Sequence, residues 1–222
     1  MSPELSAANV GLVLFDVLNG YLHPKDEAKQ AFLAERSIIA NQQRLLTAAR
    51  AVGITTFYPI GLHAADGSDT VARLTDTDME LRPRGEATIK PKFFKGSWEA
   101  QVIDELAPLP TDVVVSKNRW NAFFSTNFEL QLRVRGIDTI VIAGGSTDVG
   151  IASTVFAARD LDYGIVVVSD CCYSARGNNS EFFMERVFPR MGRVMKTDDV
   201  IAHMKGGPQS GHCCEVAPLV RQ

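Results

Sequence analysis

Short apolar runs alternate with stretches of helical periodicity along the chain. Six runs rich in Val and Ile predict β-strands, at residues 10–17, 54–60, 112–117, 137–144, 164–170 and 192–196. Between them, apolar residues recur every three or four positions, which predicts helices at residues 26–52, 98–106, 126–136, 147–163 and 178–188. Strands that are apolar on both faces and alternate with helices predict an α/β fold, with a parallel sheet covered on both sides.

The predicted elements form a single domain over residues 1–204 of a 222-residue chain. Residues 205–222 show no periodicity, so we expect a flexible C-terminal tail. Residues 61–95 are irregular, and a loop of this length within a compact domain is usually functional, often as a lid.

Composition and charge exclude several classes of function. The chain is 45% hydrophobic and 22% charged, with a formal net charge of -3, so neither nucleic acid nor a membrane is an expected partner. There is no apolar run of about 18 residues and no secretory signal, which predicts a cytoplasmic protein. The four cysteines form two adjacent pairs, typical of reduced thiols, and the four histidines lack metal-ligand spacing. We therefore expect no metal.

Two charged residues end predicted strands, where open parallel sheets bind their ligands. Asp16 follows the apolar run "VGLVLF" of the first strand, and Lys117 ends the third strand. Asp16 is either a loop or helix-cap residue or a general acid or base, because a buried carboxylate must be paired, hydrogen-bonded or protonated. Lys117 is either a solvated surface residue or the partner of Asp16 in a buried ion pair.

The segment "GGSTDVG", residues 144–150, joins the fourth strand to the next helix. Its glycines permit a sharp bend, and its backbone N–H groups at a helix N-terminus form a potential cradle for an anion or oxyanion. The alternative is an ordinary turn in which Ser146 or Thr147 caps the helix. The segment is neither a dinucleotide fingerprint nor a P-loop, so no nucleotide cofactor is expected.

Further residues near strand ends, in this turn and in the long loop are candidates for binding a small molecule. Aromatic ones suit a partly apolar wall and an arginine suits a carboxylate, although core packing and solvated loop positions also explain them. The candidates are Tyr21, Tyr58, His63, Arg82, Trp120, Phe123, Gly145, Ser146 and Val149. Cys171 and Cys172 follow the predicted fifth strand, either as buried inert thiols or at the rim of the pocket.

The segments "LVLFDVLNGY" and "VVVSKNRWNAFFST", the turn "GGSTDVG" and the order of elements resemble the isochorismatase-like hydrolase superfamily, also called cysteine hydrolases. The resemblance spans about residues 10–200. It implies a three-layer, Rossmann-like sandwich around a six-stranded parallel sheet, a homo-oligomer, and a site of Asp, Lys and Cys. Asp16 and Lys117 match the first two, and a non-proline cis peptide is expected at Gly145–Ser146. Because only His63 stands in the region where the nicotinamidase branch binds zinc, that branch is not indicated.

The cysteine of this resemblance matches Gly150, which has no side chain to attack a substrate. Isochorismatases also carry glycine here and cleave a vinyl ether by protonation and addition of water. The first hypothesis is therefore a hydrolase of a small carboxylate- or amide-bearing metabolite that uses Asp16, Lys117 and water, with Gly150 leaving room for water or a bulky substrate. The alternatives are a cysteine amidohydrolase whose nucleophile was replaced, and a non-catalytic small-molecule-binding homologue.

Overall fold

The computed structural model describes residues 4–69, 76–77, 80–81 and 93–205. Its main sheet has six parallel strands, which confirms the predicted fold class. In spatial order they are β6 (Val113–Lys117), β3 (Thr55–Gly61), β2 (Val10–Phe15), β7 (Thr139–Gly145), β8 (Gly164–Tyr173) and β9 (Arg193–Met195). The chain fills the sheet from β2 toward β6 and then from β7 toward β9, so the switch point, where such sheets bind ligands, lies between β2 and β7.

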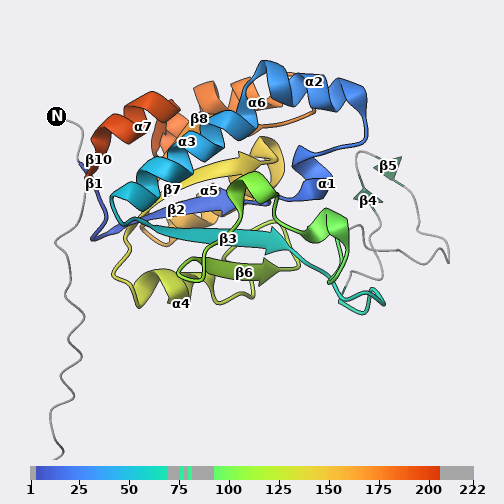
Figure 1. The fold of residues 1–222 in the computed structure, drawn as a ribbon, viewed down its shortest axis with the longest axis horizontal. Helices are drawn as coiled ribbons and strands as arrows, with labels where there is room; N and C mark the ends of the chain where they lie inside the picture. The colour runs from blue at the N-terminus through green and yellow to red at the C-terminus, as the bar shows by residue number, and fades with distance from the viewer. Residues whose placement is uncertain (1–3, 70–75, 78–79, 82–92, 206–222) are drawn as a thin grey trace, which may run out of the picture.

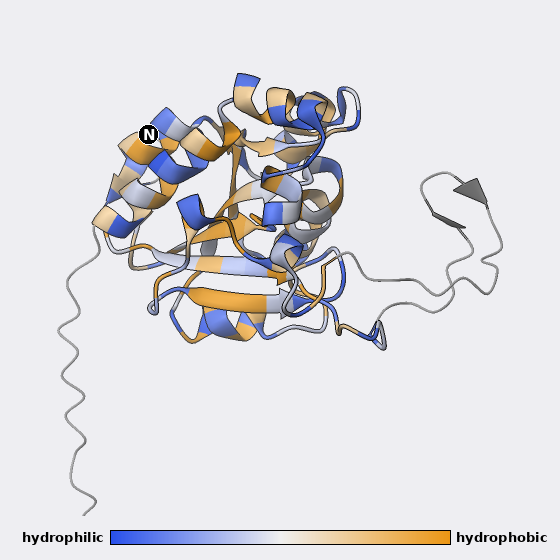
Figure 2. Ribbon diagram, turned by 45° about the vertical axis from the view of Figure 1, so that its right-hand side comes forward, coloured by the Kyte–Doolittle hydropathy of each residue, from blue (hydrophilic) through white to orange (hydrophobic). Residues whose placement is uncertain are grey.

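Helices cover both faces of this sheet. Helices α3 (Ile38–Ala51) and α7 (Thr197–His203) lie above it in Figure 1, and α4 (Phe128–Arg133) lies below. Helix α5 (Ala152–Asp160) packs against β8 from the α4 side. Successive side chains of the strands point to opposite faces and form two buried apolar layers. Figure 2 shows hydrophobic residues concentrated along the strands in the middle of the molecule.

The stretch predicted as one helix at residues 26–52 is two helices, so that prediction is wrong in its length. Helix α2 (Glu27–Glu35) begins after Asp26, whose carboxylate accepts a hydrogen bond from the backbone N–H of Lys29. The chain then turns at Ser37, which adopts a left-handed conformation with φ of 52°, before α3 begins. Apolar spacing continues through the break, so periodicity alone did not reveal it.

Other predicted helices are shorter or less regular than expected. Residues 98–106 form two 3₁₀ turns, η1 (Trp98–Ala100) and η2 (Asp104–Leu106). The helix after β7 begins with a π-helical turn, η3 (Thr147–Ile151), and the helix near residue 180 is α6 (Asn179–Phe182) followed by η4 (Phe183–Val187) and η5 (Phe188–Arg190). No described helix has the length and apolar character required to cross a membrane.

Short elements that the sequence did not predict complete the fold. They are α1 (Asn19–Leu22), the pairs β1 (Leu5–Ser6) with β10 (Met204–Lys205) and β4 (Asp76–Thr77) with β5 (Glu80–Leu81), and α7. The β1–β10 pair joins the two ends of the described chain. Most of the predicted lid, Arg82 and the predicted tail from residue 206 onward lie outside the described residues.

Strand β8 is longer than predicted and contains Cys171 and Cys172, which therefore do not follow the strand. Both thiols are buried, and neither residue lines the cavity described below. Burial raises the pKa of Cys171 to about 12 and raises that of Cys172 as well. These thiols fit the inert alternative and not the pocket rim.

Candidate active site

Asp16 stands at the carboxyl end of the central strand β2. It has a φ of 49°, a conformation that is uncommon for a residue with a side chain, and only 7% of its surface is exposed. One carboxylate oxygen accepts a hydrogen bond from the Gly61 backbone N–H at 2.6 Å. The other accepts one from Lys117 Nζ at 2.7 Å. The strand end therefore holds the carboxylate across the end of the neighbouring strand β3.

Lys117 ends β6, two strands away from β2, and is only 4% exposed. Besides its contact with Asp16, its ammonium group lies 4.3 Å from the ring centroid of Phe15. A cation over an aromatic face is stabilised by the ring quadrupole, and this effect grows when the cation is desolvated. The structure thus forms the Asp16–Lys117 pair that the sequence left as one of two alternatives.

Burial dominates the proton affinity of Asp16. Desolvation raises the pKa of its carboxyl group above the ordinary value, even though the charge of Lys117 and the hydrogen bonds from Lys117 and Gly61 act to lower it. The pKa of the neighbouring Tyr21 is also raised, first by burial and then by the charge of Asp16. The site therefore contains a carboxyl group that keeps its proton to a higher pH than a solvated aspartate does.

The end of β7 approaches β2 so closely that residue 144 must be glycine. Gly144 has a φ of 126°, and a Cβ atom there would lie 2.0 Å from the carbonyl oxygen of Phe15. The peptide between Gly145 and Ser146 is cis, as expected. The hydroxyl group of Ser146 donates to the carboxylate of Asp148 instead of capping the helix through its side chain.

Asp148 ties this turn to the following elements. Asn179 Nδ2 donates to Asp148 Oδ2 at 2.7 Å, and the hydroxyl groups of Thr147 and Ser180 lie 3.0 Å apart. Burial acts to raise the pKa of Asp148, but hydrogen bonds from Ser146, Asn179 and Ser174 outweigh it and the pKa is lowered. Asp148 is thus a structural anion of the turn, in contrast to Asp16.

The ring of Phe15 fills the space next to Gly150. A Cβ atom on Gly150 would lie 2.3 Å from Cε1 and 2.8 Å from Cζ of this ring, and Phe15 itself is fully buried. The ring therefore occupies the Cβ position of Gly150, while Gly150 itself lines the cavity described below, so the expectation that it leaves room for water or a bulky substrate stays a prediction. The space that a nucleophile's side chain would need is occupied by the residue that precedes Asp16 and supports Lys117.

A cavity of about 330 Å³ opens over the Asp16–Lys117 pair. Nine of the predicted site residues line it: Asp16, Tyr21, His63, Lys117, Trp120, Gly145, Ser146, Val149 and Gly150. Gly61, Phe93, Asn118, Arg119 and Arg176 also line it and were not predicted. Asn118 and Arg119 directly follow Lys117 and were recognisable by that position; Arg176 was missed because β8 extends beyond its predicted end.

Two predicted binding residues belong to the apolar core instead. Tyr58 is fully buried within β3 on the α3 side, with its hydroxyl group 3.4 Å from an Arg50 nitrogen. Phe123 packs against Phe128 and Tyr163, at centroid distances of 4.8 and 5.7 Å. Both lie near strand ends in sequence, but their side chains point away from the cavity. The third, Arg82, lies outside the described residues.

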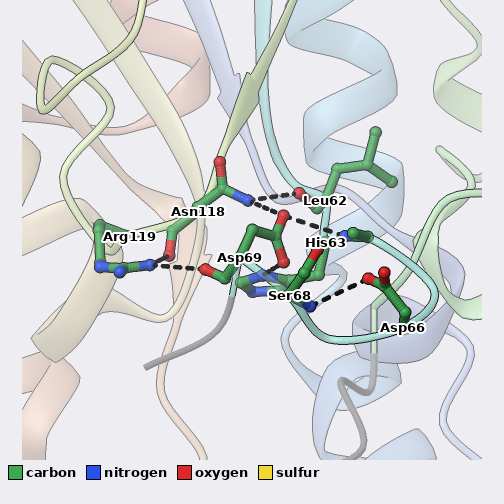
Figure 3. A network of polar contacts seen from close by, with 8 residues as sticks. Leu62, His63, Asp66, Ser68, Asp69, Asn118 and Arg119 are labelled. Atoms are coloured by element: carbon green, nitrogen blue, oxygen red, sulfur yellow. Dashed lines mark hydrogen bonds and ion pairs between the residues drawn. The ribbon is translucent and has the colours of Figure 1, made fainter. Parts of the chain in front are cut away.

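Asp69 organises one wall of the cavity (Figure 3). Its carboxylate lies 3.2 Å from His63 Nδ1 and accepts hydrogen bonds from Asn118 Nδ2 at 2.6 Å and the Ala64 N–H at 3.0 Å. Burial acts to raise the pKa of Asp69, but the bonds from Ala64 and His63 outweigh it and the pKa is lowered. This anion fixes the orientation of the His63 ring at the cavity wall.

The residue types at this site favour acid–base chemistry over metal binding. Within the described part of the chain, no three His, Cys, Asp or Glu side chains are grouped so that they could hold a metal ion. Asp16 accepts from Lys117 and from a backbone N–H, which are donors and not co-ligands. The arrangement places a carboxyl group, a cation and an imidazole around a space suited to a small molecule.

Comparisons with known proteins identify similar chains of nearly the same length. A family model described as an isochorismatase domain matches residues 10–199. The chain is 30% identical over 195 residues to the uncharacterized isochorismatase family protein YwoC of Bacillus subtilis, covering 87% of this chain and 93% of that one. An isochorismatase family protein from Burkholderia thailandensis has a similar structure, with a TM-score of 0.72, 29% identity, and coverage of 90% and 97% of the two chains. N-carbamoylsarcosine amidase from Thermoplasma acidophilum, at 23% identity, a TM-score of 0.64 and 86% and 97% coverage, shares the fold.

Proposed function

Because the chain belongs to the isochorismatase family of hydrolases, we propose that it hydrolyses a small metabolite without a covalent nucleophile. The observation that carries the proposal is the packing of Phe15 against Gly150 beside the buried Asp16–Lys117 pair. A covalent mechanism needs a side chain at Gly150, and an acid-catalysed one needs only a protonated carboxyl group and water. A buried carboxyl group with a raised pKa beside a cavity supports the second mechanism.

Asp16 is the proposed general acid. Its raised pKa keeps a proton available at the end of β2, next to the cavity. For a vinyl ether, this proton is transferred to the terminal alkene carbon, and water adds to the resulting oxygen-stabilised cation. The water then returns a proton to the Asp16 carboxylate, and the hemiketal collapses to a carbonyl compound and an alcohol. For a C–N bond, the same group protonates the leaving nitrogen while water attacks.

Lys117 and Gly61 have a supporting role in this proposal. Both donate hydrogen bonds to the carboxylate oxygens, so they stabilise the anion that forms once the proton has left. Phe15 holds the ammonium group from the other side. The backbone of the 144–150 turn is the proposed binding site for a substrate oxygen, since Gly145, Ser146 and Gly150 line the same cavity.

The packing of Phe15 disfavours the replaced-nucleophile alternative. A cysteine at position 150 would place its Cβ atom within 2.3 Å of a fully buried ring, so the two positions are matched to each other. A small-molecule substrate, no resident cofactor and a homo-oligomeric state remain predictions. Size-exclusion chromatography with light scattering tests the last of these.

Substitution of Asp16 tests the proposed function directly. We expect Asp16→Asn to lower turnover by roughly 10²–10⁴-fold on any substrate found in a panel of vinyl ethers, amides and ureides, because the general acid is lost. The activity of the unaltered protein should fall as the pH rises through the raised pKa of Asp16, because the protonated acid is then depleted. Asp104→Asn, at an exposed aspartate, is the matched control. An unchanged rate in Asp16→Asn refutes the mechanism, and tight binding without turnover across the panel favours the non-catalytic alternative.

A further inference from the structure

A second cavity, of about 480 Å³, adjoins the catalytic one. Tyr21, Ser146 and Arg176 line both, so the two spaces share a wall. The second cavity extends toward the loop between α1 and α2, toward α2 itself and toward η1. These segments supply His23 and Lys25, Lys29, and Trp98 respectively. Its volume, added to that of the catalytic cavity, suits a molecule longer than the reacting group alone.

Tyr173 contributes a hydrogen-bond donor to this region. The residue lines the second cavity, is 8% exposed, and its hydroxyl group has no hydrogen-bond partner within the described part of the chain. The hydroxyl oxygen lies 2.8 Å from the position that a Cβ atom on Gly145 would take, which places it at the boundary with the catalytic cavity. Burial raises the pKa of Tyr173, so the group stays protonated. Because the hydroxyl oxygen is itself buried, a ligand oxygen reaches it only after a small outward shift of the ring, and the cost of a buried donor without an acceptor favours that contact.

Charged side chains of both signs line the second cavity. Three are cations, Lys25, Lys29 and Arg176, and His23 adds an imidazole. The acidic residues in the wall are Asp26 and Glu99. Asp26 already lies 4.0 Å from Lys29 and caps α2, while His23 contacts Glu105 at 3.1 Å. An anion entering this cavity therefore meets the ammonium group of Lys25.

Aromatic side chains form the apolar part of the wall. Tyr21 and Phe32 line the cavity, and so does Trp98, which is 47% exposed. An apolar wall with a few donors and cations suits an organic carboxylate better than an inorganic anion. The apolar segment of such a ligand would contact the rings, and its carboxylate would contact the donors.

We propose that the second cavity binds a carboxylate-bearing extension of the substrate, with the Tyr173 hydroxyl donating to a carboxylate oxygen. This rests on the proposed function, because the reacting end of the same molecule then lies at Asp16. It defines the substrate class as an elongated organic acid whose scissile group is separated from its carboxylate. Tyr173 is a specificity-determining residue in this arrangement, and Arg176 lies where the two parts of the ligand meet.

The two tryptophans of the chain allow each cavity to be observed separately. Trp98 lines the second cavity and Trp120 lines the catalytic one. Trp120→Phe leaves a reporter for the second cavity, and Trp98→Phe leaves one for the catalytic cavity. The probes are 3-phenylpropanoate and its uncharged match, 3-phenylpropanamide, titrated against the fluorescence of each variant.

We expect the Trp98 fluorescence to reach its half-maximal change at a carboxylate concentration at least about tenfold lower than the amide concentration. A hydrogen bond to a charged group strengthens binding by about that factor or more. Tyr173→Phe should remove most of this preference. Lys25→Gln should weaken binding of the carboxylate probe a few-fold, and at high salt this variant should bind the probe as well as the protein with Lys25 does. Once a substrate is known, Tyr173→Phe should raise KM more than it lowers kcat.

Three results overturn the inference: equal response to the two probes, a carboxylate response confined to Trp120, or an unchanged preference in Tyr173→Phe. The same titration in Asp16→Asn separates this inference from the proposed mechanism. A preserved Trp98 response there supports the second cavity whatever happens to turnover. An active Asp16→Asn refutes the mechanism and leaves the binding result unaffected.

Discussion

Among the described residues, the Asp16–Lys117 pair and the Cys171–Cys172 pair are both buried, and of these two pairs the first faces a cavity. Asp16 and Lys117 meet at the carboxyl ends of β2 and β6, where each finds an opposite charge. Cys171 and Cys172 lie within β8 and point to opposite faces of the sheet. Burial raises the pKa of the Asp16 carboxyl group and of both thiols.

The same shift has opposite chemical consequences in the two pairs. A raised carboxyl pKa produces an acid that retains its proton nearer neutral pH, and a raised thiol pKa removes the thiolate, which is the nucleophilic form. Cys171 Sγ lies 3.1 Å from the hydroxyl group of Thr197, and Cys172 Sγ lies 3.9 Å from the carbonyl oxygen of Ile142. Position at a strand end and a charged partner, more than residue type, distinguish the pair that we propose to be reactive.

Removal of the partner charge should have the largest effect on stability. Lys117→Met leaves the Asp16 carboxylate buried without its cation, and breaking such a pair typically costs about 3–5 kcal/mol when the remaining group stays charged. Because Lys117 lowers the pKa of Asp16, the substitution raises that pKa further, and the alkaline limb of the activity profile should move to higher pH.

The sign of the pH dependence follows from the raised pKa. The folded state holds the Asp16 proton to a higher pH than the unfolded state, whose value is near 3.8, so stability falls as the pH rises above that value. Stability continues to fall until the pH reaches the pKa of Asp16 in the folded state. Lys117→Met raises that pKa, so in this variant the fall continues to a higher pH. Urea unfolding at pH 5 and pH 8 should therefore show a larger deficit at pH 8, with Lys29→Met as the exposed control. A deficit that is equal at both pH values contradicts the pairing.

A side chain at position 150 should have the next largest effect. Gly150→Cys forces the ring of Phe15 to move and should cost about 1–3 kcal/mol, as overpacking in a core usually does. In a Phe15→Val background the same substitution should cost at least about 1 kcal/mol less, because the two positions share one space. Thermal or urea unfolding of the four proteins in this cycle measures the coupling. If the stability changes of Phe15→Val and Gly150→Cys are additive, the ring of Phe15 does not occupy the space that a side chain at position 150 needs.

The thiols of β8 should matter least. Cys172→Ala should leave turnover within about twofold and cost about 1 kcal/mol of stability, since it removes one buried sulfur atom from the core. Cys171→Ala is the matched variant on the other face of the sheet. A tenfold loss of turnover in either variant would overturn the contrast between the two pairs.

Much of this arrangement was predictable from local patterns. Fully apolar strands separated by helical spacing predict a parallel sheet, and Asp16 and Lys117 stand immediately after such strands. The turn from Gly144 to Gly150 was recognisable by its glycines and by its position between a strand and a helix. The cis peptide before Ser146 was implied by the family resemblance and is present.

Other features depend on neighbours that are remote in sequence. Phe15 fills the space beside Gly150 because β2 and β7 are adjacent, and a run of apolar letters does not state which ring meets which glycine. Tyr58 and Phe123 stand close to strand ends but point into the core. Arg176 and Tyr173 line the second cavity because β8 continues beyond its apolar run. Strand pattern and end residues are local properties of the chain, since backbone geometry repeats every two residues. The orientation of a side chain and its neighbours are decided only when segments distant in sequence pack together, because two side chains cannot occupy the same volume.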